Sequence, residues 1–164
     1  MAQARESYKM NDEKGGAKSY RHAEQAFRKA MKTAPKSAAP CLRLGELQWT
    51  LLHEGGDESF RQDAVDSFKM AAERDPAGVD GAALGAWLKE DSIPVFGVLI
   101  EKEPNNELHY WYRGSQYYAQ GPKAWKETRD DFLKVMELNP TYTSAYFFLA
   151  NGAMARGAQL SNAG

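Results

Sequence analysis

One spacing of small, aromatic and proline residues recurs along the chain, and this repeat constrains the fold more than any other feature of the sequence. A small residue is followed at plus four by phenylalanine, at plus seven by a second small residue and at plus twelve by proline. Two copies keep these residue types unchanged: Ala23, Phe27, Ala30 and Pro35, then Ala64, Phe68, Ala71 and Pro76. Two looser copies are Thr128, Phe132, Val135 and Pro140, and Phe96 with Pro104. The sequence therefore predicts four copies of one helix ending.

The spacing has a direct physical reading. Positions four and seven residues after the first lie on the same face of an α-helix, where small residues admit a neighbouring helix and phenylalanine fills the space between. Proline cannot continue the helix, so each copy ends and turns there. A second pattern, in which glycine allows a close crossing beside a large residue, stands on a first helix of its own: Leu44 with Gly45, Leu84 with Gly85, and Gly114 with Tyr117. Helices are therefore expected in pairs.

These two patterns together resemble the tetratricopeptide repeat family, whose unit carries Trp, Leu, Gly and Tyr on its first helix and Ala, Phe and Pro on its second. Tyr20 matches the aromatic residue that opens the second helix, and residues 131–140 read almost as the family's ending. The resemblance covers roughly residues 4 to 158. It implies an all-α, right-handed superhelix, an α-solenoid of about nine antiparallel helices.

We expect helices at 4–14, 19–33, 38–53, 59–74, 78–90, 93–102, 106–119, 122–138 and 142–157. They are expected to form one domain over 1–164, with units at about 4–37, 38–77, 78–105 and 106–142 and a half unit at 143–158. Ser7 and Asn11 stand where the first unit should carry Trp and Gly, and extra residues near 52–62 lengthen the second unit. Because only seven residues follow Gly157, no capping helix is expected after the last one.

Composition excludes several classes of protein. The 164 residues carry 21 Lys and Arg against 22 Asp and Glu, so the chain lacks the basic field that binds nucleic acid or anionic lipid. A hydrophobic share of 43% is too high for a disordered chain. The single cysteine, Cys41, falls where a first helix packs inward, so we expect a buried thiol and not a nucleophile. No signal peptide or transmembrane segment is visible, so a soluble, cytoplasmic protein is expected.

Catalytic and metal-binding patterns find no support in the sequence. The three histidines lie in separate units without ligands at metal spacing: His22, His53 and His109. The pairs Gly15–Gly16 and Gly55–Gly56 lack the Lys-Ser or Lys-Thr of a phosphate loop. Carboxylate pairs such as Asp130–Asp131 are expected on solvated helix faces. We therefore expect no enzyme activity, no metal and no cofactor.

The family resemblance implies a concave groove that binds extended peptides or partner helices. By that resemblance, the candidate groove residues are Leu42, Glu46, Trp49, Ala82, Lys89, Leu108, Trp111, Ser115, Tyr118 and Asn151. The Lys and Asn that clamp a C-terminal carboxylate in some family members are absent, so an apolar or aromatic ligand is the better match. The alternative is that Trp49, Trp111 and Tyr118 only pack between helices.

The last helix offers a second candidate surface, because the run Tyr146, Phe147, Phe148 and Leu149 is apolar around more than one face. It is expected to dock on another subunit or a partner protein, unless the tail from Ala158 to Gly164 folds back over it. We therefore predict a non-catalytic scaffold, adaptor or complex subunit with protein or peptide partners, no nucleic acid, no membrane insertion and a homo-oligomer as one option. The alternative is an accessory protein that takes a hydrophobic small molecule, lipid or peptide in the groove or pore.

Overall fold

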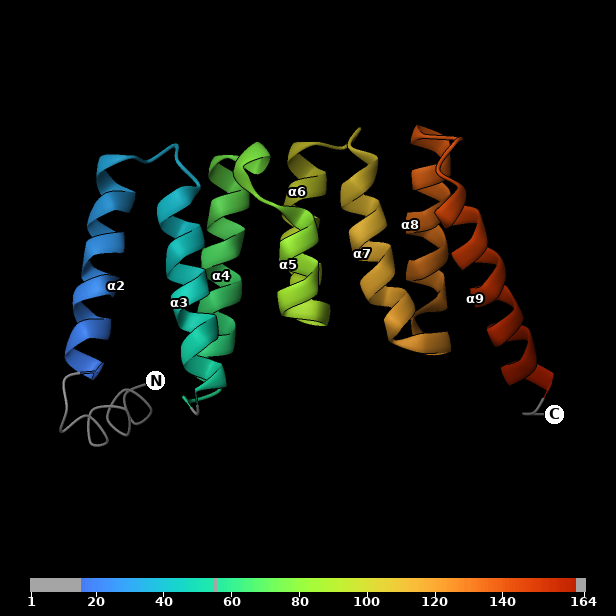
Figure 1. The fold of residues 1–164 in the computed structure, drawn as a ribbon. Helices are drawn as coiled ribbons and strands as arrows, with labels where there is room; N and C mark the ends of the chain where they lie inside the picture. The colour runs from blue at the N-terminus through green and yellow to red at the C-terminus, as the bar shows by residue number, and fades with distance from the viewer. Residues whose placement is uncertain (1–15, 55, 162–164) are drawn as a thin grey trace. The chain divides into compact units, whose positions relative to one another are not determined.

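The structure is a computed structural model that describes residues 16–54 and 56–161, and these residues form helices and short turns without any strand. The expected helix at 4–14, with Ser7 and Asn11, lies outside the described residues. The chain divides into two compact units, one that ends at Val79 and one that begins at Asp80. Figure 1 shows that successive helices within each unit run in alternating directions. The all-α class is therefore confirmed for the described residues, while one repeat domain over the whole chain stays a prediction.

The N-terminal unit contains α2 (Gly16–Thr33), α3 (Ala39–His53) and α4 (Ser59–Arg74), followed by the 3-10 turn η1 (Pro76–Gly78). Helix α3 packs against both α2 and α4. The core includes Cys41, Leu44 and Phe68, all buried, and a cluster in which Tyr20 meets the edge of the Phe60 ring. The helices expected at 19–33, 38–53 and 59–74 are observed here, although the first begins at Gly16, and Pro76 follows the end of the last one as the repeat spacing predicts.

The C-terminal unit contains α5 (Gly81–Leu88), η2 (Lys89–Ser92), α6 (Ile93–Lys102), α7 (Glu107–Ala119), η3 (Gly121–Ala124), α8 (Trp125–Leu138) and α9 (Thr143–Ser161). Helix α7 packs against α5, α6 and α8, and α8 packs against α9. The Asp80 side chain caps α5 by accepting a hydrogen bond from the Ala83 amide, and Asn106 caps α7 in the same way through Leu108.

Three further expected helices differ from the structure. The helix expected at 78–90 ends at Leu88, because Lys89 leaves helical geometry and η2 leads directly into α6. The helix expected at 122–138 opens as the 3-10 turn η3 and becomes α-helical at Trp125. The last helix, expected to stop at 157, continues to Ser161, so a tail folded back from Ala158 is wrong for residues 158–161. No proline follows Gly157, and Ala158 and Leu160 are good helix formers.

In the predicted pairs α3–α4 and α7–α8, a glycine of the first helix lies against a phenylalanine ring of the second, and Gly85 of α5 lies in ordinary contact with a ring of α6. A Cβ atom added to the glycine would lie 2.9 Å from Phe68 at Gly45, 3.6 Å from Phe96 at Gly85 and 2.9 Å from Phe132 at Gly114. All three rings are buried, whereas Phe27 of α2 is half-buried. The structure thus confirms that small residues allow the close approach and that phenylalanine fills the space beside them.

Replacing Gly114 with alanine should destabilise the protein by about 1–2 kcal/mol, because overpacking against Phe132 costs more than alanine's helix propensity returns. The buried ring cannot move aside, and the added Cβ would also lie 3.1 Å from the Cβ of Asp131. The matched control is Gly97→Ala in α6, where no atom lies within 4 Å of the added Cβ.

In urea titrations we expect Gly97→Ala to be neutral or stabilising by up to about 1 kcal/mol. Equal effects of the two substitutions on the free energy of unfolding would contradict the close crossing of α7 and α8.

Candidate functional site

The predicted groove residues of the N-terminal unit, Leu42, Glu46 and Trp49, are all half-buried on α3. The Glu46 carboxylate accepts a hydrogen bond of 2.6 Å from Arg43. The Trp49 ring lies 5.0 Å from the His53 ring, and the Arg61 guanidinium of α4 lies 5.9 Å from the centre of the indole. Trp49 therefore already has a cation–π partner within its own unit, and only part of its surface faces a ligand.

Predicted groove residues Ala82 and Lys89 of the C-terminal unit are exposed around α5, and Leu108 is exposed at the start of α7. Lys89 has φ 50° and ψ −125°, a backbone conformation that suits glycine and strains a residue with a Cβ atom. The turn after α5 therefore holds Lys89 in place through its backbone.

Trp111 is half-buried and packs against the aromatic cluster of the C-terminal unit. Its ring centre lies 5.0 Å from Tyr142, 5.4 Å from Phe132 and 5.6 Å from Phe148. Ser115, one turn later, donates its hydroxyl to the Trp111 carbonyl at 2.8 Å. Both side chains are thus engaged internally, as the alternative interpretation of packing between helices expects for Trp111.

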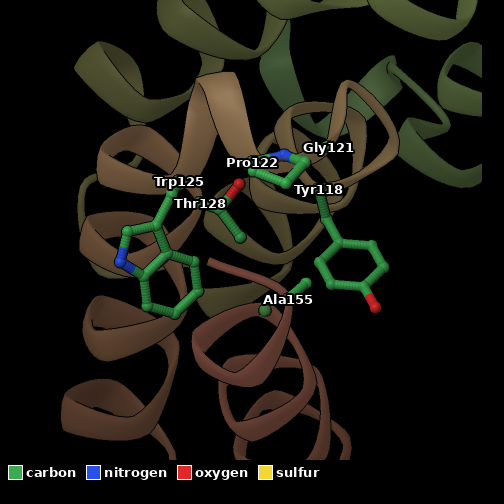
Figure 2. Close-up of a pocket in the computed structure, with 7 residues that line it drawn as sticks. Tyr118, Gly121, Pro122, Trp125, Thr128 and Ala155 are labelled. Carbon is green, nitrogen blue, oxygen red and sulfur yellow. The ribbon is translucent and has the colours of Figure 1, made fainter. Parts of the chain in front are cut away.

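Tyr118 lies at the edge of a partly open cavity of about 170 Å³ that is lined by residues of α7, η3, α8 and α9. We call it the Tyr118–Trp125 cavity, and its lining residues are Tyr118, Gly121, Pro122, Trp125, Thr128, Gly152 and Ala155. Figure 2 shows the two aromatic rings on opposite sides, with Pro122 and Ala155 between them. No charged side chain lines the cavity, so it suits an apolar group.

Two glycines shape this cavity. A Cβ atom on Gly152 would overlap the Trp125 indole, at 2.9 Å from one ring carbon, so only glycine lets α9 lie against this tryptophan. Gly121 has φ 76°, the left-handed region, where it turns the chain from α7 into η3. Trp125 and Gly152 were not among the predicted site residues, because their meeting depends on the packing of α9. The Gly121-Pro122 turn just before Trp125 was the one local signal.

The predicted subunit interface on α9 is divided by the structure. Phe148 and Leu149 turn inward onto the cluster around Phe132, and the Phe148 ring lies 5.0 Å from Tyr118. Tyr146 and Phe147 stay on the surface, with 45% and 62% of their area exposed. Asn151, the last predicted groove residue, is half-buried on the same helix. The exposed pair is therefore the part of this run that remains free to meet a partner.

A buried ion pair joins α7 and α8, and it corrects one expectation. Asp131 was expected on a solvated face, but its side chain is only 5% exposed and accepts two hydrogen bonds from Arg113, at 2.9 and 2.7 Å. Burial raises the pKa of Asp131, whereas its hydrogen bonds raise the pKa of Arg113. One feature of the sequence could have indicated this ion pair. Arg113 stands just before Gly114, where the other first helices carry leucine.

Within residues 16–54 and 56–161, no three His, Cys, Asp or Glu side chains gather closely enough to hold a metal ion. Cys41 is buried as expected, and burial raises the pKa of its thiol, which disfavours the nucleophilic thiolate. Buried His109 lies 2.8 Å from Glu103, and hydrogen bonds from His109 and Asn106 lower the pKa of that carboxyl. No described helix is both long and apolar enough to cross a bilayer.

The single substitution Arg113→Leu should lower the free energy of unfolding by about 3 kcal/mol, because Asp131 would be left buried without its partner. The double substitution Arg113→Leu with Asp131→Ala should recover much of this loss, because it removes both charges from the interface of α7 and α8. Chemical denaturation of the two single variants and the double variant measures the coupling between the residues. Additive effects, within about 0.5 kcal/mol, would show that the pair does not act as a unit.

Lys89→Gly should raise the free energy of unfolding by about 1 kcal/mol, because glycine adopts the backbone angles of this position without strain. Lys89→Ala is the control, since it removes the amine but keeps the Cβ atom. Thermal unfolding of both variants separates the two contributions, and a gain in stability for the alanine variant would assign the effect to the side chain instead.

No family model matches the sequence. No curated protein matches it either. Among solved structures, the crystal structure of MamA protein is similar in 98% of this chain and 88% of that chain, at 19% sequence identity and a TM-score of 0.46. The function proposed below therefore depends on the contacts of this chain's own helices.

Proposed function

We propose that the chain is a non-catalytic interaction module, built of tetratricopeptide-like helix pairs, that acts as an adaptor or as a subunit of a larger complex. It binds a partner protein by accepting an apolar side chain, presented by a peptide or helix, in the Tyr118–Trp125 cavity. The observation that carries this proposal is that Tyr118, a residue predicted for the groove, lines an apolar cavity. Like the other aromatic groove candidates, Trp49 and Trp111, Tyr118 contacts a ring of its own unit, but part of its surface also borders this cavity.

The size of the cavity favours a single side chain. Its volume of about 170 Å³ is close to the roughly 150 Å³ that holds one benzene molecule in a protein interior. Pockets for drug-sized molecules have volumes of about 300–1,000 Å³, so a lipid tail or a large ligand exceeds the available space. A leucine, methionine or phenylalanine side chain fits the volume, and such buried anchors dominate the binding energy of many interfaces.

The residues that line the cavity also favour an apolar side chain as its occupant. Thr128 is a buried polar residue in the lining of the cavity, and its hydroxyl donates to the Ala124 carbonyl at 2.9 Å. Its hydrogen bond is therefore satisfied without a ligand, and the aromatic rings of Tyr118 and Trp125 provide the remaining contact surface. A charged or strongly polar group would lose its hydration there without gaining a partner.

A second candidate function is the binding of a small hydrophobic molecule, and the benzene-like volume of the cavity is what favours it. Such a ligand would be one small ring and not a lipid. The two functions differ in whether a free ring compound binds. It binds by itself in the second function, whereas in the first function a side chain binds only together with its flanking peptide.

The test is a selection of peptides from a displayed random library on the full chain, followed by titration of the selected peptides and of toluene. We expect peptides with one essential aromatic or aliphatic residue, and Ala155→Phe, which fills the cavity mouth, should weaken them at least about tenfold. Ala83→Phe places the same ring on an exposed alanine of α5 and should leave binding unchanged.

Equal peptide affinity for wild type and Ala155→Phe would reject the cavity as the binding site. Saturable binding of toluene, lost in Ala155→Phe and accompanied by no selected peptide, would favour the second function. Nuclear magnetic resonance of the Trp125 indole proton provides a local readout in either titration.

A further inference from the structure

Helix α9 carries an exposed face. We infer its role by comparing it with the corresponding face of α7. In α7, one side packs on the pair before it: the Tyr112 ring stacks on Phe96 at 5.7 Å, and the Gln116 amide lies 3.4 Å from the Gly85 carbonyl. The neighbouring side receives the second helix α8, with Gly114 beside Phe132. A first helix in this unit therefore has two distinct packing faces.

The same register applies to α9. Phe148 and Gly152 stand 36 positions after Tyr112 and Gln116, and they also pack on the preceding pair, against Trp111 and Trp125. The residues of α7 that face its second helix, α8, have counterparts 36 positions later, on α9. These counterparts are Tyr146, Leu149, Ala150 and Ala153. In α7 this face is covered by α8, whereas in α9 three of the four residues are exposed.

The exposed face extends along the whole helix. Beyond Ala153 it continues one turn at a time through Gly157 to Leu160, which is 59% exposed. Phe147 and Met154 flank it and are exposed over more than half of their surface. The one charged side chain in α9 is Arg156, which is half-buried. A face this apolar, with small residues that permit close approach, matches the requirements of a second packed helix.

The arrangement of large and small residues on this face is self-complementary. Tyr146 and Leu160 each stand seven residues, or two helical turns, from Ala153, with Ala150 and Gly157 in between. When two copies run antiparallel about a twofold axis at Ala153, Tyr146 of each copy lies opposite Leu160 of the other copy. The small residues then meet at the crossing. Tyr146, Ala150, Ala153, Gly157 and Leu160 are uncharged, so no like charges lie directly opposite one another among them when two copies pair.

We propose that a second copy of this chain covers this face, so that two α9 helices pack antiparallel through Tyr146, Ala150, Ala153, Gly157 and Leu160. Each copy then supplies the second helix for the first helix of the other. The dimer surface is separate from the Tyr118–Trp125 cavity, so the dimer and peptide binding can be tested independently.

The experiment is sedimentation equilibrium of the full chain, in which wild type should show twice the 18.3 kDa mass of one chain. Ala153→Glu places two like charges at the twofold axis and should weaken the dimer at least about tenfold, and Ala153→Lys should do the same. Mixing these two variants pairs opposite charges and should restore a mixed dimer. Ala83→Glu, an exposed alanine of α5, is the matched control and should remain dimeric.

Circular dichroism checks that each variant keeps its helices, as expected because Ala153 is exposed. A monomeric wild type at about 200 μM would overturn the proposal, because a dimer this weak cannot serve the chain. An unchanged dimer in Ala153→Glu would overturn it as well, and so would a mixture of the glutamate and lysine variants that stays monomeric. Peptide binding measured on Ala153→Glu should equal that of wild type, which separates this result from a failure of the cavity.

Discussion

Close contact between a glycine and a phenylalanine ring is the interaction on which the rest of the structure depends. At Gly45 and Gly114 the ring of the second helix occupies the space that a Cβ atom would need, so the two helix axes approach closely and the ring is fully buried. Burying such a ring contributes about 1.5–3 kcal/mol in transfer free energy. The contact also fixes the rotation of each helix about its own axis, because only one face of the first helix carries the glycine. That rotation decides which side chains face the next helix and which face solvent.

The candidate binding features of the C-terminal unit follow from this rotation. With Gly114 beside Phe132, Trp111 turns into the aromatic cluster, and Tyr118, seven residues later, lies at the edge of the cavity. The Arg113–Asp131 pair lies next to the same contact and replaces an apolar contact by two charge-assisted hydrogen bonds. Taking these two charges out of water costs free energy, which offsets much of what the hydrogen bonds contribute to stability. Apolar contact surface and helix register are thus set by the same few residues.

The pairs α3–α4 and α7–α8 and several helix bounds could be predicted from the sequence, and individual site residues could not. The bounds of α4 and α6 were predicted to the residue, because Pro76 and Pro104 mark the ends and the apolar spacing marks the faces. The predicted bounds failed where local geometry departs from a regular helix, at Lys89 and at η3, since positive φ and 3-10 turns leave no periodic signature. Asp131 was misplaced because its environment depends on a residue 18 positions earlier, on another helix.

The amino-acid sequence alone determined that helices form, where most of them end and that they pair, because periodicity and proline act through the local backbone. It also determined that Cys41 is buried, since its position lies on the inward face of α3. Only the tertiary structure decided that Tyr118 borders a cavity while Trp111 packs against the cluster around Phe132, and that Phe148 turns inward while Phe147 is exposed. These outcomes depend on which residues of other helices arrive nearby, and contacts between distant segments are not encoded in any local pattern of the chain.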